Sequence, residues 1–71
     1  MSPEKLAYMA NQIGKFFAHQ GGDKAVASIV DHLKKFWTPS MRQQARVHLD
    51  GGGAFDPLVA QAIKQLGEPA A

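Results

Sequence analysis

The stretch Asp31-His32-Leu33-Lys34-Lys35-Phe36-Trp37-Thr38-Pro39-Ser40-Met41-Arg42 predicts two helices that meet at a tight corner. Pro39 has no amide proton, and its ring clashes with the preceding turn, so the first helix must end before it. The same residue suits the first position of the next helix, with Thr38 as the N-cap. Two large aromatic residues, Phe36 and Trp37, precede the break. We expect Phe36, Trp37 and Met41 to pack at the elbow between the two helices.

Helical patterns extend from this corner in both directions and predict an all-α fold of four helices. Apolar residues recur at three- and four-residue spacing, and proline or glycine marks each boundary. Gly21-Gly22 ends the first helix, Asp23 caps the second, and Gly51-Gly52-Gly53 separates the last two. The helices are expected at about residues 3–20, 24–37, 39–49 and 57–66. They would form a single helical domain, residues 1–67, followed by a flexible tail, residues 68–71.

The apolar stripes of these helices predict the hydrophobic core. On a helical wheel, each stripe falls on one side of its helix, opposite most of the charged residues. We expect most of the following side chains to be buried within the chain: Leu6, Met9, Ile13, Phe16, Val26, Ile29, Leu33, Phe36, Met41, Leu58, Ala62 and Ile63.

The first helix carries a second row of mostly small residues beside its main stripe: Ala7, Ala10, Gly14, Phe17 and Ala18. One interpretation is that this row admits a second helix at close range. The other is that Gly14 only weakens the helix, by about 1 kcal/mol relative to alanine. The sequence leaves both open.

Length and composition exclude several classes of site. The chain has 71 residues and no cysteine. A domain this short has a small core and usually gains stability from disulfides, a metal or a partner subunit. Without cysteine, disulfides, zinc–thiolate sites and iron–sulfur ligation by thiolates are excluded.

The sequence predicts a cytoplasmic protein without a membrane anchor. No apolar run approaches the roughly 20 residues that a membrane span needs. The first residues also lack the basic and then apolar layout of a signal peptide.

The positive charge of the chain is small and scattered, with a formal net charge of +2. Apart from Lys34-Lys35 the basic residues stand singly, so we expect no nucleic-acid partner. The alternative from another class is a small helix-turn-helix DNA-binding protein. In it Arg42, Gln43, Gln44 and Arg46 would enter the major groove. Little other positive charge supports phosphate contacts for such a protein.

The residues that carry chemistry are few. His19, His32 and His48 lack the spacing to each other or to acids that a helical metal site requires, and no HExxH motif occurs. No Ser/His/Asp set suggests an activated nucleophile. We therefore expect no catalytic, metal-binding or cofactor-binding residue, and no enzymatic activity of the chain itself.

Three blocks of the sequence form one pattern over about residues 5 to 63: Leu6, Met9 to Ile13 and Phe16-Phe17; Asp31 to Leu33, Phe36-Trp37, Pro39 and Met41-Arg42; and Gly51-Gly52 with Asp56 to Val59. These blocks resemble the small delta subunit of NAD-dependent, molybdenum-containing formate dehydrogenase. At three positions, Thr38, Gly14 and Phe55, this sequence departs from the aspartate, alanine and leucine of that pattern.

The resemblance implies a non-catalytic accessory subunit. In that family the alpha subunit holds the molybdenum cofactor and most iron–sulfur clusters, and the beta and gamma subunits carry electrons to flavin and NAD. The delta chain is associated with assembly, maturation or stability of the complex. The expected partner is the alpha subunit, within a complex that also contains beta and gamma.

The apolar surface of the chain indicates where that partner would bind. A small chain with broad apolar arcs is stabilised when a partner covers the excess, and interface hot spots favour tryptophan and arginine. We therefore expect Phe17, Phe36, Trp37 and Arg42 to contact the alpha subunit. A third possibility is a helical protein that self-associates and has no other partner.

Overall fold

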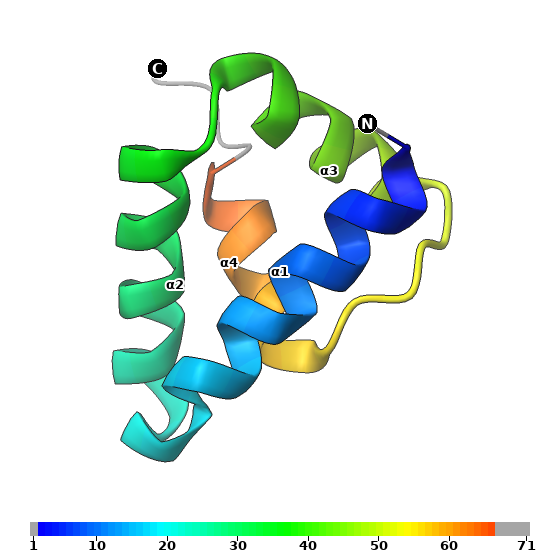
Figure 1. Cartoon of the computed structure of the whole chain (residues 1–71). Coiled ribbons are helices and arrows are strands. Elements are labelled where there is room, and N and C mark those ends of the chain that lie inside the picture. Colours follow the sequence, from blue (N-terminus) through cyan, green and yellow to red (C-terminus); the bar gives the residue numbers. More distant parts are fainter. Residues whose placement is uncertain (1, 67–71) are drawn as a thin grey trace.

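The computed structural model describes residues 2–66, and its regular elements are helices (Figure 1). In chain order they are α1 (Pro3–Phe17), a short 3-10 turn (Ala18–Gln20), α2 (Gly22–Phe36), α3 (Pro39–Asp50) and α4 (Pro57–Leu66). The predicted all-α class with four helices is confirmed. The tail predicted at residues 68–71 lies outside the described residues.

The corner that organises the sequence forms as its local chemistry predicts. The Thr38 hydroxyl accepts a hydrogen bond from the Met41 amide at 3.1 Å, and Pro39 is the first residue of α3. The turn between α1 and α2 differs from the prediction. The N-cap of α2 is Gly21, with φ of 80°, and Asp23 lies in the first turn. Asp23 still benefits there from the positive end of the helix dipole.

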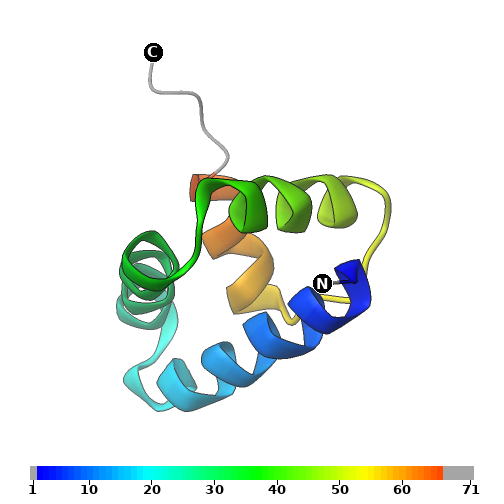
Figure 2. The ribbon, with the colours of Figure 1, turned by 45° about the horizontal axis from the view of Figure 1, so that its top comes forward.

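Helix α4 is the centre of the packing. Figure 2 shows α4 between α1 and α3, with α2 at one end, and α4 contacts each of the other three helices. Because α4 is surrounded, the side chains that line its inner face are inaccessible to solvent. The core consists of Leu6, Ala10, Val26, Ile29, Leu33, Trp37, Ala45, Val59, Ala62 and Ile63.

Two of the predicted core residues lie on the surface instead. Phe16 is 71% exposed and Phe36 is 70% exposed, so their predicted burial is wrong. In α1 the buried side is the row of small residues together with Leu6, which turns Phe16 outward. Phe36 is the last residue of α2, and the extended backbone at Trp37 directs the next side chain inward. Met9, Ile13, Met41 and Leu58 are half-buried against the core.

The row of small residues on α1 admits a second helix, and that helix is α4. Gly14 is buried, and a β-carbon added to it would overlap Val59 Cγ2. Ala7 and Ala10 are buried on the same face, whereas Ala18 is exposed. Of the two interpretations of Gly14, the structure therefore selects close helix packing.

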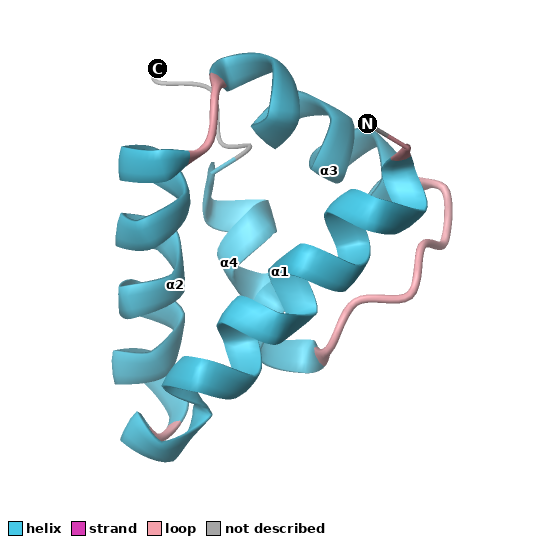
Figure 3. Ribbon diagram, viewed as in Figure 1, coloured by secondary structure: helices cyan, strands magenta, loops and turns pink. Residues whose placement is uncertain are grey.

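Figure 3 shows the loop between α3 and α4 in pink. The side chain of Asn11 on α1 holds this loop by two hydrogen bonds. Asn11 donates to the Ala54 carbonyl at 3.0 Å and accepts from the Asp56 amide at 2.9 Å. Because Asp56 directly precedes α4, this pair of bonds fixes where α4 begins relative to α1.

Candidate functional site

Four aromatic rings form a row across the outer side of α1 and α2, and we call Phe16, Phe17, His32 and Phe36 the aromatic row. Phe16 and Phe17 pack edge to face with ring centroids 5.1 Å apart. Phe17 and His32 are 6.1 Å apart, and His32 and Phe36 are 4.7 Å apart. Aromatic pairs at these separations stabilise one another beyond the area that they bury. The row therefore presents ordered rings at the surface.

The aromatic row continues into an open groove between α1 and α2. In Figure 1 these helices converge at the 3-10 turn and diverge towards α3, and the groove lies on their diverging part. Its volume is about 480 Å³. We call it the α1–α2 groove, and its lining residues are Tyr8, Met9, Gln12, Ile13, His32, Phe36, Trp37 and Met41. Phe17 and Phe36 are far apart in sequence, but the ring of His32 lies between theirs and joins them into one surface.

Trp37 belongs to both the core and this groove. It is only 6% exposed and packs in the same cluster as Leu33 and Ala45. Part of its indole nevertheless lines the groove beside Phe36 and Met41. A substitution at Trp37 would therefore disturb the fold and the surface together.

Arg42 stabilises the corner that the sequence predicts. Its Nη1 donates to the carbonyl oxygens of Trp37 at 2.9 Å, Lys34 at 3.2 Å and Leu33 at 3.3 Å. The Leu33 carbonyl also accepts from the Trp37 amide at 3.0 Å. Most carbonyls in the last turn of a helix lack an intrahelical donor, so Arg42 supplies one to Lys34 and Trp37, and its charge interacts favourably with the helix dipole. Arg42 thus clamps the end of α2 to α3, a role that the sequence analysis missed.

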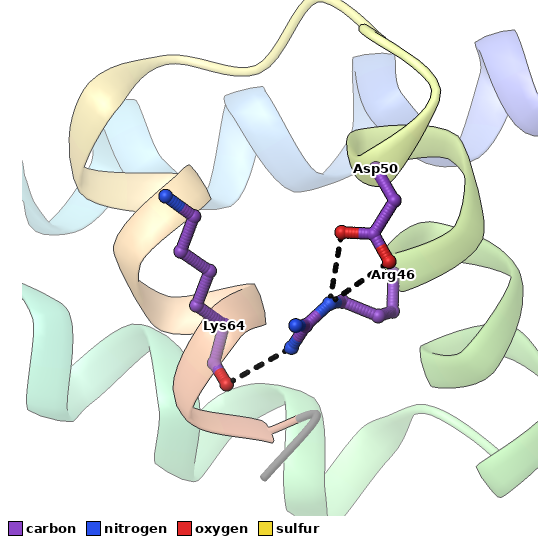
Figure 4. Close-up of polar contacts among 3 residues, drawn as sticks. All are labelled: Arg46, Asp50 and Lys64. Carbon is purple, nitrogen blue, oxygen red and sulfur yellow. Dashed lines mark hydrogen bonds and ion pairs between the residues drawn. The ribbon is translucent and has the colours of Figure 1, made fainter.

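Arg46, one turn after Arg42 on α3, contacts the C-terminal turn of α4 in a similar way. Figure 4 shows its Nη1 donating to the Lys64 carbonyl at 3.2 Å, while Nε pairs with Asp50 at 3.1 Å. Both arginines that a helix-turn-helix protein would direct at DNA are engaged with the C-terminal turns of neighbouring helices. This geometry gives the DNA-binding alternative no support.

In the described part, the remaining polar side chains meet in separate pairs, such as Ser28 with Gln20 and Lys35 with Asp31. Within residues 2–66, no group of three or more His, Asp or Glu side chains lies close enough to hold a metal ion. His48 packs edge to face against Phe55, with ring centroids 5.7 Å apart, far from the aromatic row in sequence. None of the described helices is long and apolar enough to cross a membrane.

Several groove residues were not candidates from sequence. Tyr8 and Gln12 fall on the polar side of the predicted first helix, and His32 falls at the edge of an apolar arc. One signal could have identified them: a helix with one small and one large apolar row buries the small row where packing is closest. In α1 the small row takes the closest contact, so Met9 and Ile13 of the large row are only half-buried and Phe16 is exposed. The residues beside them then line the groove.

The comparison with protein families covers almost all of this structure. The family described as NADH-dependent formate dehydrogenase delta subunit, FdsD, matches residues 5–63. The matched stretch contains the whole aromatic row and every residue of the α1–α2 groove. No curated protein and no solved structure is significantly similar to the chain.

Proposed function

Because the chain belongs to the delta subunit family of NADH-dependent formate dehydrogenase, we propose that it is a non-catalytic accessory subunit of that enzyme. In this proposal it binds the catalytic alpha subunit in the cytoplasm, within a complex that also contains beta and gamma subunits. Its binding supports assembly, cofactor maturation or stability of the molybdenum enzyme. The family membership supports the assignment to a formate dehydrogenase complex. The surface of the chain suggests which residues contact the alpha subunit.

The observation that carries the proposal is the exposed aromatic row beside the α1–α2 groove. Large apolar side chains that stand together at a surface mark interaction sites in soluble proteins. Phe16 and Phe36 are mostly exposed, and Tyr8 on the wall of the groove is also exposed. A partner that covers these three rings removes their apolar surface from water. Each Å² of apolar surface buried in this way stabilises the complex by about 25 cal/mol.

The residues expected at the interface divide into two roles. Phe36, together with Phe16, contacts the alpha subunit directly, and Phe17 supports both through its packing against Phe16 and His32. Trp37 and Arg42 act mainly by fixing the α2–α3 corner, because one is buried and the other clamps three carbonyls. Trp37 also lines the groove, whereas Arg42 is not among its lining residues.

The experiment that tests the accessory role uses a strain that lacks this chain. The yield of active, cofactor-loaded formate dehydrogenase should fall, and expression of the chain from a plasmid should restore it. Molybdenum content and formate-dependent NAD reduction are measured on the purified complex. Fully active enzyme at normal yield without the chain would show that the accessory role is wrong.

A further inference from the structure

We propose that His32 makes partner binding at the aromatic row sensitive to pH: the partner binds while the imidazole is neutral and binds more weakly once it is protonated. The partner at this surface is the alpha subunit, and that assignment rests on the proposed function. The sensitivity to pH follows from the place of the imidazole in the row.

His32 lies between two phenylalanine rings of the aromatic row. Its ring centroid is 4.7 Å from that of Phe36 and 6.1 Å from that of Phe17. The side chain is half-buried and also lines the α1–α2 groove. A partner that contacts both Phe16 and Phe36, the two ends of the row, therefore covers His32 as well.

His32 is the member of the row that can change its charge. Imidazole gains a proton between pH 5 and 8, whereas phenylalanine does not titrate. Within residues 2–66, no protein group forms a hydrogen bond or an ion pair with either ring nitrogen of His32. In the free chain the surrounding water therefore solvates these nitrogens and the positive charge that protonation creates.

Docking changes the surroundings of the imidazole. A partner that lies on the row displaces water from His32, and an ion that loses its water without gaining a counter-ion is strongly disfavoured. A neutral imidazole loses much less when it is covered. The rings of Phe17 and Phe36 restrict the imidazole on two sides, which keeps its charge within the covered surface. Protonation of His32 therefore opposes docking.

The side of α1 that faces His32 supplies no counter-ion. Tyr8 lines the same groove, and a phenol is neutral in this pH range. One turn before it, the charges of the adjacent Glu4 and Lys5 offset each other. Lys15 lines a different cavity on the other side of α1, beside α4.

The charged groups of α2 and α3 near His32 do not offset a proton either. Asp31 pairs with Lys35 at 3.0 Å, so the carboxylate of this part of α2 is already engaged. Arg42 of α3 donates to the carbonyl of Leu33, the residue after His32, and is itself a cation. A positive charge on His32 thus finds no free carboxylate among these groups.

The sign of the pH effect follows from linkage between docking and proton binding. If docking requires the neutral imidazole, binding is strongest above the range in which the free imidazole titrates and weakens as the pH falls through it. The affinity for the alpha subunit should fall about fivefold or more from about pH 7.5 to about pH 5.5. Release of one proton on docking lowers the affinity by up to about tenfold per pH unit.

The test compares three forms of the full chain for binding to immobilised alpha subunit across this pH range. His32→Phe keeps an aromatic ring in the row but cannot be protonated, so its affinity should change much less with pH than that of the wild type. His19→Phe makes the same substitution at an exposed histidine of the 3-10 turn and should keep the wild-type dependence. Because all three forms meet the same partner, titration of the partner affects them equally.

A second variant keeps the test independent of the folding of His32→Phe. His32→Gln is polar and does not titrate, and its binding should also change little with pH. Equal pH dependence of the wild type and a folded His32 variant would overturn the proposal, as would wild-type binding that strengthens as the pH falls. Either result leaves the accessory role standing. Absence of binding at every pH would overturn both this proposal and the assigned partner.

Discussion

Gly14 of α1 lies so close to Val59 of α4 that position 14 has no room for a β-carbon. Val59 is fully buried, and its β-branched side chain has few alternative rotamers. A side chain at position 14 would therefore push the two helices apart. Glycine at this position determines which side of α1 is buried, and so which side displays Phe16.

Replacing Gly14 with alanine should destabilise the protein although alanine is the better helix former. The gain in helix propensity is about 1 kcal/mol, whereas overpacking a tight core costs about 1–3 kcal/mol. We expect a net loss of about 1 kcal/mol, which lowers Tm by about 4–8 °C in a domain of this size. Thermal unfolding followed by circular dichroism measures it.

The matched control for this substitution is a double variant. Val59→Ala removes the atoms that the new β-carbon would meet, so Gly14→Ala should cost less in that background. An equal cost in both backgrounds would show that the Gly14–Val59 contact does not limit the packing.

Removing the guanidinium of Arg42 should loosen the α2–α3 corner. Arg42→Ala leaves the carbonyls of Leu33, Lys34 and Trp37 without this donor, and hydrogen bonds to charged groups contribute about 1.5–3 kcal/mol when well protected. Because Arg42 is half-buried, we expect the free energy of unfolding to fall by about 1–2 kcal/mol, as measured by urea unfolding. Arg42→Lys should recover only part of it, since one ammonium cannot reproduce the planar donor geometry. A fully stable Arg42→Ala variant would contradict the clamp.

Asn11→Ala should release the loop that precedes α4. The substitution removes both the acceptor of the Asp56 amide and the donor to the Ala54 carbonyl. Each such bond contributes about 0.5–1.5 kcal/mol. Amide hydrogen exchange at Asp56 should become faster, while exchange at the core amides of α2 changes only with global stability. Unchanged protection of Asp56 would mean that the loop is held by other contacts.

Local chemistry explains which parts of the fold the sequence predicts well. Thr38-Pro39 sets a helix end and a helix start within two residues, so the corner follows from capping rules alone. The exposure of Phe16 and Phe36 could not be predicted in the same way. A helical wheel identifies an apolar side, but the packing of α4 decides which part of that side is covered.

The candidate site was predicted in part for the same reason. Phe36 and Trp37 are adjacent in the sequence at a predicted helix corner, and both line the groove. Phe36 is exposed and Trp37 is buried because the backbone at Trp37 is extended. That conformation depends on the turn into α3 and on the room for the indole in the core. The reach of Arg42 back to Leu33 is a tertiary contact across nine residues, and a helical pattern carries no sign of it.

The exposed position of Phe36 leads to a separate prediction about stability. Phe36→Asp should leave helical circular dichroism unchanged and alter the free energy of unfolding by less than about 1 kcal/mol, because surface substitutions usually have small effects. Phe17→Asp should cost more, since Phe17 is half-buried between Phe16 and His32. Thermal unfolding of the two variants side by side tests this order, and a larger loss for Phe36→Asp would contradict it.

The most direct test of the account is the amount of this chain that co-purifies with the catalytic alpha subunit when Phe36 is replaced by aspartate. Val47→Asp is the matched control, because Val47 is 64% exposed and lies on α3 outside the groove and the aromatic row. We expect Phe36→Asp to reduce co-purification at least about tenfold, the effect of losing a 1.4 kcal/mol contact, and Val47→Asp to leave it unchanged. Co-purification of a folded Phe36→Asp chain at the wild-type level would contradict the assignment of this surface to the partner.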